Sequence, residues 1–227
     1  MLLTSADGAV PPLELFHAHF DAGRFDVACF AGHAIALPPA IARAVPKRQA
    51  EFFFGRWCAR AALARHGHAG VVGVGPAREP LWPHGLIGSI SHSHGMAAAV
   101  ALPGMGMRGV GIDIETIAQG RALRALRQVV LSAREQAWLD ALDCPLAPDI
   151  VLTLVFSAKE SFYKAVFETV RRFLGFDAVE VVGIDCDTRR LWFDVSQALP
   201  APFVTGCRFA VGYALLGQGR VLTEFRW

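Results

Sequence analysis

The segment VGIDIE at residues 110–115 constrains the fold more than any other stretch, because it alternates strictly between apolar residues and others. Alternation with a period of two is typical of a half-buried strand, and it directs Asp113 and Glu115 to one face. Gly111 precedes them on that face without a side chain, so we expect open space beside the carboxylates. Two acids held this close repel each other unless a cation or a proton lies between them. The strand therefore predicts a cation site, although alternating acids equally describe a solvent-exposed face.

A third acid for such a site lies in the segment SAKESFYK. Carboxylate oxygens suit Mg²⁺, which usually completes its coordination with water and a substrate phosphate. Ser157-Ala-Lys-Glu160 matches a capping box, so we expect a helix over residues 157–170 with Glu160 fixed in its first turn. Lys164 follows at i+4 on the same face, beside the proposed metal centre, where it suits a bound phosphate. The alternative is that Glu160 only caps the helix and Lys164 is its ordinary ion-pair partner.

The remaining patterns predict a mixed α+β chain. Helices are expected at residues 46–66, ending at Gly67, at 121–130, and at 132–142, where Ser132-Ala-Arg-Glu135 is another capping box. Strands are expected at 85–93 and 95–102, around a turn at 93–95, and at 178–185, 189–195 and 207–216. Each half carries a helix with basic residues and a later strand of small residues. This similarity between the halves fits an internal duplication with a boundary near residue 110, and it equally fits two ordinary α+β halves.

Basic residues in the first half predict a phosphate-binding surface. Arg56 and Arg60 are four residues apart on the helix at 46–66, so both guanidinium groups share one side, which suits a phosphate. A solvated helix face is the alternative. His92 ends a strand where its imidazole could bond a phosphate, and otherwise it is an ordinary loop histidine. The HxH pairs at 17/19, 66/68 and 92/94 lack further ligands nearby, so we do not expect zinc, and no P-loop or GxGxxG occurs.

Composition bounds the class of protein. The chain has 227 residues, 53% of them hydrophobic and 19% charged, which is typical of a compact globular protein. Its net charge of +2 does not indicate nucleic acid as a partner. Five scattered cysteines without a CxxC pair indicate free thiols. We see no signal peptide and no apolar run long enough to span a bilayer, so we expect a cytoplasmic protein.

The order of four motifs is more specific than any of them alone. RWCARAAL, REPLWPHGLIGSISHS, VGIDIE and FSAKESFYKAV together resemble the 4′-phosphopantetheinyl transferases, within the surfactin-type group most strongly the enterobactin-synthetase component D proteins. The likeness runs from about residue 45 to 170. It implies an α+β fold of two similar halves with pseudo-twofold symmetry, each a small antiparallel sheet packed with helices, and an active site in the cleft between them. It favours the duplication, with halves at residues 1–109 and 110–227.

The resemblance also implies an activity and a set of roles. The protein would transfer the 4′-phosphopantetheine group from coenzyme A to a serine of an apo acyl or peptidyl carrier protein, with Mg²⁺, releasing adenosine 3′,5′-bisphosphate. We expect a monomer, and siderophore or other secondary-metabolite assembly as the pathway. The implied metal ligands are Asp113, Glu115 and Glu160. Glu160 would also be the base, directly or through water, and Lys164 would contact the phosphate and help the nucleotide leave. The implied coenzyme A ligands are Arg48, Arg56, Arg60, Ser91 and His92.

One position departs from the family pattern. Many relatives have GKP where this chain has Arg78-Glu79-Pro80, so Arg78 is the candidate to supply the missing positive charge. Two rival functions remain at this point. One is another Mg²⁺-dependent phosphotransfer enzyme, such as a pyrophosphatase or nuclease, that uses the same acids. The other is a non-catalytic relative that binds coenzyme A or carrier protein.

Overall fold

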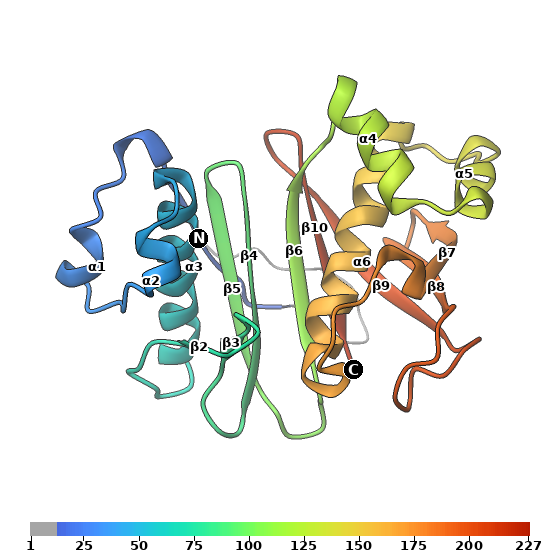
Figure 1. The fold of residues 1–227 in the computed structure, drawn as a ribbon. Coiled ribbons are helices and arrows are strands. Elements are labelled where there is room, and N and C mark those ends of the chain that lie inside the picture. The colour runs from blue at the N-terminus through green and yellow to red at the C-terminus, as the bar shows by residue number, and fades with distance from the viewer. Residues whose placement is uncertain (1–12) are drawn as a thin grey trace. The chain divides into compact units, whose positions relative to one another are not determined.

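A computed structural model describes residues 13–227 of the chain (Figure 1). Their contacts gather into two compact units that divide between Arg108 and Gly109. Both units combine helices with antiparallel sheets, which confirms the predicted α+β class. No helix within residues 13–227 is long and apolar enough to cross a membrane.

The first unit is built around a three-stranded sheet of order β1-β5-β4. Its strands are β1 (Phe16–His19), β4 (Leu86–Ser93) and β5 (Met96–Pro103), and a two-stranded sheet joins β2 (Gly73–Val74) to β3 (Pro80–Leu81). Its helices are η1 (Ala22–Arg24), α1 (Cys29–Gly32), α2 (Pro39–Ala42) and α3 (Pro46–Ala64). The predicted hairpin at residues 85–102 is therefore present, with His94 and Gly95 both at positive φ in its turn.

The long helix α3 packs across this sheet, and its sequence explains how closely. Pro46 occupies the first helical position, where the missing N–H costs no bond, and Gly67 takes the predicted left-handed conformation beyond the last turn. Small residues of α3 meet small residues of β5 in a core that contains Cys58, Ala59, Ala62, Ala97, Ala99 and Ala101. Small side chains on both elements let the helix lie close to the sheet, so the side chains at its edges reach neighbouring loops.

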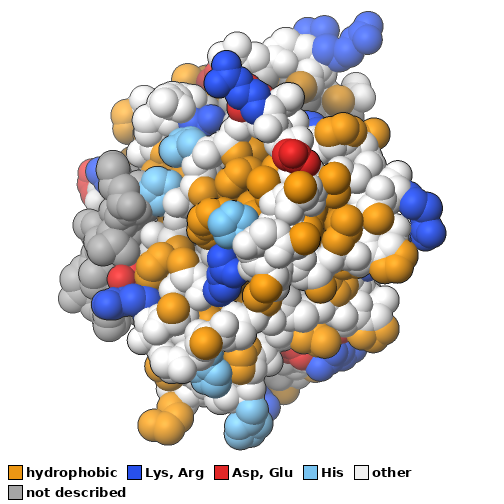
Figure 2. All heavy atoms as spheres, turned by 90° about the vertical axis from the view of Figure 1, so that its left-hand side faces the viewer, with side chains coloured by type: hydrophobic (Ala, Val, Ile, Leu, Met, Phe, Trp, Pro, Cys, Tyr) orange, Lys and Arg blue, Asp and Glu red, His pale blue; other side chains and the backbone are white. Residues whose placement is uncertain are grey.

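The outer surface on the α1–α3 side is mixed in character. Figure 2 looks onto this side and shows hydrophobic side chains gathered near its centre, with Lys, Arg and His scattered among and around them. Its exposed apolar residues include Val27, Val45 and Trp57, of which only Trp57 lies in α3.

The second unit holds a five-stranded sheet of order β6-β10-β9-β8-β7. The strands are β6 (Val110–Thr116), β7 (Val179–Asp185), β8 (Arg190–Val195), β9 (Arg208–Leu216) and β10 (Arg220–Arg226). The helices are α4 (Gly120–Val130), α5 (Ala133–Asp140), α6 (Pro148–Val170) and η2 (Phe176–Ala178). In Figure 1, α6 runs along β6 and β10. Apolar side chains of α6 and of the sheet make up most of the core of this unit.

The helix that carries SAKES begins earlier than predicted. α6 starts at Pro148, so Ser157 and Glu160 lie in its middle and form no capping box, and that prediction is wrong. The apolar run at residues 150–156 continues the same helix and is almost wholly buried. By contrast, the capping box at Ser132 is confirmed, with both of its reciprocal hydrogen bonds present. The two capping boxes differ because α4 has ended before Ser132, whereas the helix continues without a break through Ser157.

Candidate functional site

Asp113 and Lys164 form the central ion pair of the second unit. Asp113 lies on β6 and is only 4% exposed, which rules out the solvent-face alternative for this residue. The Lys164 ammonium, one turn beyond Glu160 on α6, donates to Oδ1 of Asp113 at 2.6 Å and to the carbonyl of Ile112 at 3.2 Å. The lysine therefore bonds both the side chain and the backbone of the strand that carries the acids.

Gly111 has a different role from the one predicted. A Cβ at this position would lie 1.8 Å from the carbonyl oxygen of Ser161, and one at Gly109 would lie 2.0 Å from that of Ala165. The expected open space above the strand is therefore filled by the backbone of α6. These two glycines let the helix lie directly on β6, which brings Asp113 within reach of Lys164.

Glu160 lies partly buried beside this pair. Desolvation raises the pKa of its carboxyl group, Lys164 opposes this, and Asp113 adds to it. A small cavity of about 10 Å³, enough for one water-sized group, is bounded by Glu160, Tyr163 and the segment Leu174–Val179. Burial and the neighbouring Glu160 also raise the pKa of Tyr163. Burial therefore makes the charged form of Glu160 less stable than it would be in water, and Lys164 offsets part of that cost.

The three predicted metal ligands are only partly brought together. The interaction between Asp113 and Glu160 places these two carboxylates near each other, and Glu115 is half-buried further along β6. Within residues 13–227, no three His, Cys, Asp or Glu side chains form a cluster that could hold a metal ion. The donor chemistry still fits Mg²⁺, because carboxylate oxygens that repel each other are stabilised by a hard cation.

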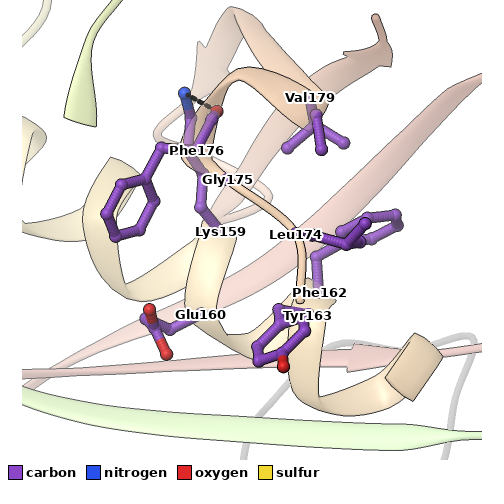
Figure 3. A pocket seen from close by; sticks show the side chains of 9 residues that line it. Lys159, Glu160, Phe162, Tyr163, Leu174, Gly175, Phe176 and Val179 are labelled. Carbon is purple, nitrogen blue, oxygen red and sulfur yellow. Dashed lines mark hydrogen bonds between the residues drawn. The ribbon is translucent and has the colours of Figure 1, made fainter. Parts of the chain in front are cut away.

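Lys159 is a structural residue of this site that the sequence reasoning missed. Its ammonium is 2% exposed and donates to Glu135 at 2.7 and 2.9 Å and to the carbonyls of Val130 and Phe176. Glu135 also accepts the backbone N–H of Ser132 and of Val181. Figure 3 shows Lys159 bonded to Phe176 while the next residue, Glu160, points the other way. Glu135, the glutamate of the capping box that begins at Ser132, was the one sequence signal that pointed to Lys159. A buried carboxylate needs a cationic partner, and here that partner lies in a neighbouring helix.

In the first unit, Arg56 is a buried cation that pairs with no carboxylate of the described residues. It is 6% exposed, donates to the carbonyl of Gly73 at 3.2 Å and stacks on Phe52. Its Nε is buried without a hydrogen bond, and no carboxylate within residues 13–227 bonds to it. Burial, and then the charge of Arg48, lower its pKa to about 10. The solvated-face alternative is therefore wrong for Arg56, and an anion would complete its hydrogen bonding.

Arg48 links α3 to His92 on β4. Its guanidinium lies 2.7 Å from Nε2 of His92, and Nδ1 of the same ring lies 3.7 Å from Glu51. A guanidinium only donates, so Nε2 must accept, and the proton of a neutral ring then lies on Nδ1, facing Glu51. Arg48, Arg56 and His92 thus form one polar region at the same side of α3.

The other predicted coenzyme A ligands lie apart from that region. Arg60 donates to the carbonyl of His33 at 2.6 Å, so it does not share a partner with Arg56. Ser91 is buried on the face of β4 opposite to His92, as adjacent strand residues must be. Arg78 is exposed at positive φ in the turn between β2 and β3, while Glu79 is buried against Gly75.

Two family models match this chain, one in each unit. The family model described as 4′-phosphopantetheinyl transferase N-terminal domain matches residues 37–102, and the 4′-phosphopantetheinyl transferase superfamily matches residues 109–198. These two matches cover α3 and the hairpin in the first unit, and β6 and α6 in the second.

Individual relatives agree with these matches. The chain is 37% identical over 164 residues to enterobactin synthase component D of Salmonella typhi, covering 71% of this chain and 67% of that protein. It is 39% identical over 145 residues to 4′-phosphopantetheinyl transferase Npt of Nocardia iowensis, covering 62% of each chain. It is 36% identical over 187 residues to 4′-phosphopantetheinyl transferase Svp of Streptomyces mobaraensis, covering 81% of this chain and 74% of that protein.

Proposed function

Because this chain belongs to the 4′-phosphopantetheinyl transferase family, we propose that it transfers 4′-phosphopantetheine from coenzyme A to a serine of an apo carrier protein. The observation that carries this proposal is the ion pair of Asp113 and Lys164, with Glu160 close enough to interact electrostatically with both. It sets two carboxylates and an ammonium around one point, which is the charge pattern that a pyrophosphate and its cation require. Release of adenosine 3′,5′-bisphosphate and dependence on Mg²⁺ are part of the proposal.

The side chains of the second unit have distinct roles in this reaction. Asp113, Glu115 and Glu160 would hold Mg²⁺, which when bound neutralises charge on the pyrophosphate oxygens. Glu160 accepts the proton of the carrier serine, directly or through a water molecule, because its carboxylate lies on α6 beside Asp113 and Lys164. Lys164 then orients the phosphate and stabilises the charge of the departing nucleotide.

The bonds made and broken balance without a further reactant. The serine oxygen forms a bond to the β-phosphorus of coenzyme A as the bond from that phosphorus to the bridging oxygen breaks. The serine proton passes to Glu160, and the leaving group is adenosine 3′,5′-bisphosphate. Positioning and electrostatic stabilisation supply most of the acceleration in a transfer of this kind.

The first unit binds the nucleotide end of coenzyme A in this proposal. Arg56 is the best-supported ligand for the 3′-phosphate, because it is already desolvated and no carboxylate of residues 13–227 bonds to it. Arg48 and His92 add a second cation and a ring nitrogen beside it. Arg60, Ser91 and Arg78 remain proposed ligands with weaker support, since their positions do not converge on Arg56.

The carrier protein is the second substrate. Carrier proteins of this family are typically acidic, and α4 exposes Arg121 and Arg124, whereas Arg127 is paired with Asp140. We place the carrier against the two exposed arginines. The names of the relatives indicate a siderophore or another secondary metabolite as the product of the pathway.

One assay separates this proposal from its rivals. The protein is incubated with coenzyme A, Mg²⁺ and an apo carrier protein, and the carrier is weighed by mass spectrometry. A gain equal to phosphopantetheine, lost on addition of a chelator, is the expected result. Hydrolysis of coenzyme A without transfer would indicate another phosphotransfer enzyme, and binding without any reaction would indicate a non-catalytic relative.

A further inference from the structure

Three buried hydroxyl groups join α6 to the two strands beneath it. Ser157 and Ser161 on α6 and Thr223 on β10 are all 0% exposed. The oxygen of Thr223 lies 2.9 Å from that of Ser157 and 2.6 Å from that of Ser161. Ser161 also reaches the carbonyl of Thr223 at 3.1 Å, and Ser157 reaches the carbonyl of Asp113 at 3.3 Å. We call these three residues the hydroxyl triad.

The hydroxyl triad can satisfy all of its donors at once. In one consistent arrangement, Ser157 donates to the hydroxyl of Thr223, Thr223 donates to the hydroxyl of Ser161, and Ser161 donates to the carbonyl of Thr223. Each hydroxyl supplies one proton, so none is left without an acceptor. The network therefore depends on all three residues. It joins two positions one turn apart on α6 to a single residue of β10.

The location of the hydroxyl triad ties it to the proposed reaction. Thr223 is the direct cross-strand partner of Asp113, so both side chains point towards α6. Ser161 follows Glu160 in the sequence and lies over Gly111. A change in the position of α6 at the triad would therefore move Glu160 and Lys164 relative to Asp113.

At Gly109 and Gly111, side-chain packing contributes little to fixing the position of α6 along β6. Side chains usually hold a helix in register by fitting between one another, but Gly109 and Gly111 offer the helix a bare strand at this point. Three alanine- or valine-like side chains would fill the same space without the cost of burying hydroxyls. Hydrogen bonds between buried hydroxyls favour one position of the helix over slightly shifted positions. A shift would leave a buried donor without an acceptor.

We propose that Ser157, Ser161 and Thr223 are positioning residues that set the register of α6 on β6 and so align Glu160 and Lys164 with Asp113. The inference rests on the transfer reaction proposed above. In this proposal, none of the three residues touches coenzyme A or the carrier serine. Their effect passes through the residues next to them, and it changes the rate of the chemical step.

The test compares Thr223→Val, which keeps the shape of the side chain and removes the hydroxyl, with the wild type in steady-state transfer. We expect kcat to fall by about 10- to 100-fold, because small misplacement of reacting groups is costly, while KM for coenzyme A stays within about twofold. Thr223→Ser restores the hydroxyl and should restore most of kcat. Ser161→Ala gives the same comparison from the helix side and replaces Thr223→Val if that variant does not fold.

Thr153→Val is the matched control. Thr153 lies earlier on α6, is 1% exposed and bonds Asp149 and Ala118, so the control also loses one buried hydroxyl from this helix. It should lose stability without loss of kcat. If Thr223→Val keeps its kcat, or if Thr153→Val loses as much, the triad has no positioning role.

A second readout does not depend on activity. An amine-acylating reagent should modify Lys164 several-fold faster in Thr223→Val than in the wild type, with the exposed Lys47 as an internal reference. Unchanged labelling of Lys164 would overturn the proposal. Absence of transfer in the wild type would instead count against the proposed function, and the labelling comparison would still decide the role of the triad.

Discussion

Glu160 and Arg56 are charged side chains that the fold withdraws from water before any ligand binds. Desolvation raises the pKa of Glu160 and lowers that of Arg56, so each shift disfavours the charged form. Both residues therefore cost stability in the free protein. A cation bound near Glu160 and an anion bound near Arg56 would stabilise the charged forms of these side chains. The free energy that burial costs in the free protein would then contribute to ligand binding.

Replacing Glu160 should stabilise the protein and abolish its activity. A carboxyl with a raised folded pKa holds its proton more tightly in the folded state, so stability falls as pH rises between the unfolded and folded pKa values. We expect Glu160→Gln to unfold at a higher urea concentration than wild type at pH 7 without Mg²⁺, and this difference to vanish as pH falls towards 4. Transfer should drop by orders of magnitude. A variant that is less stable but fully active would show Glu160 to be structural.

Replacing Arg56 should discriminate between two forms of coenzyme A. Loss of one charge-assisted hydrogen bond to the 3′-phosphate costs about 1.5–3 kcal/mol, or roughly a 10- to 150-fold rise in KM. We expect this rise for coenzyme A in Arg56→Ala and little change for dephospho-coenzyme A, which lacks that phosphate. Arg65→Ala is the control, because its exposed guanidinium pairs with Glu14 and has no proposed role in binding coenzyme A. Equal losses with both substrates would assign Arg56 to the fold.

At the scale of elements, α6 is held from several sides, and Lys159 is its main polar anchor. The ammonium joins the end of α4, the first turn of α5 and the segment before β7 through Val130, Glu135 and Phe176. Burial lowers the pKa of Lys159, while Glu135 opposes that shift. The pair is fully satisfied, so it specifies how these elements meet rather than adding much net stability.

Breaking this pair on one side should be far worse than removing it altogether. Lys159→Met leaves the Glu135 carboxylate buried, which should cost about 3–5 kcal/mol in the free energy of unfolding, measured by urea denaturation. Adding Glu135→Gln removes the stranded charge and should recover part of that loss. Arg134→Ala, whose exposed guanidinium lies 3.5 Å from Glu180, should cost less than about 1 kcal/mol. A double variant no more stable than Lys159→Met would refute this account.

The elements also show where sequence reasoning succeeds. Residues 110–115 form the predicted strand, and α3 and the hairpin at residues 85–102 follow from local periodicity and turn chemistry. The start of α6 was missed because Ser157 and Glu160 match a capping box but are used for tertiary contacts. The strand β10 was missed as well, and with it Thr223. Open space was predicted beside Gly111, but the backbone of α6 fills it. The residue pattern of one strand does not reveal which helix packs on that strand.

At the scale of the whole molecule, the residues proposed to bind the two ends of coenzyme A lie in different units. The first unit holds Arg48, Arg56 and His92, which suit a nucleotide phosphate. The second holds Asp113, Glu160 and Lys164, which suit the pyrophosphate and its cation. Coenzyme A has both groups, so its two ends should protect different segments of the chain.

Hydrogen exchange should reveal this division. We expect coenzyme A without Mg²⁺ to slow exchange chiefly around α3, and the addition of Mg²⁺ to extend the protection to β6 and α6. Asp113→Ala should keep the first effect and lose the second, because it removes a proposed metal ligand without touching Arg56. Protection of β6 and α6 by Mg²⁺ that persists in Asp113→Ala would place the metal elsewhere.

The pairing of β6 with β10 has a consequence for the order in which the protein can form. Val110 pairs with Arg226, and Asp113 with Thr223, so β6 meets its neighbour only after the intervening chain has been synthesised. Contacts between residues so distant in sequence form slowly, since the loop between them must close first. On a growing nascent chain, the pairing of Asp113 with Thr223 therefore waits for β10, even though α6 is available earlier. The five-stranded sheet is complete only once β10 lies between β6 and β9.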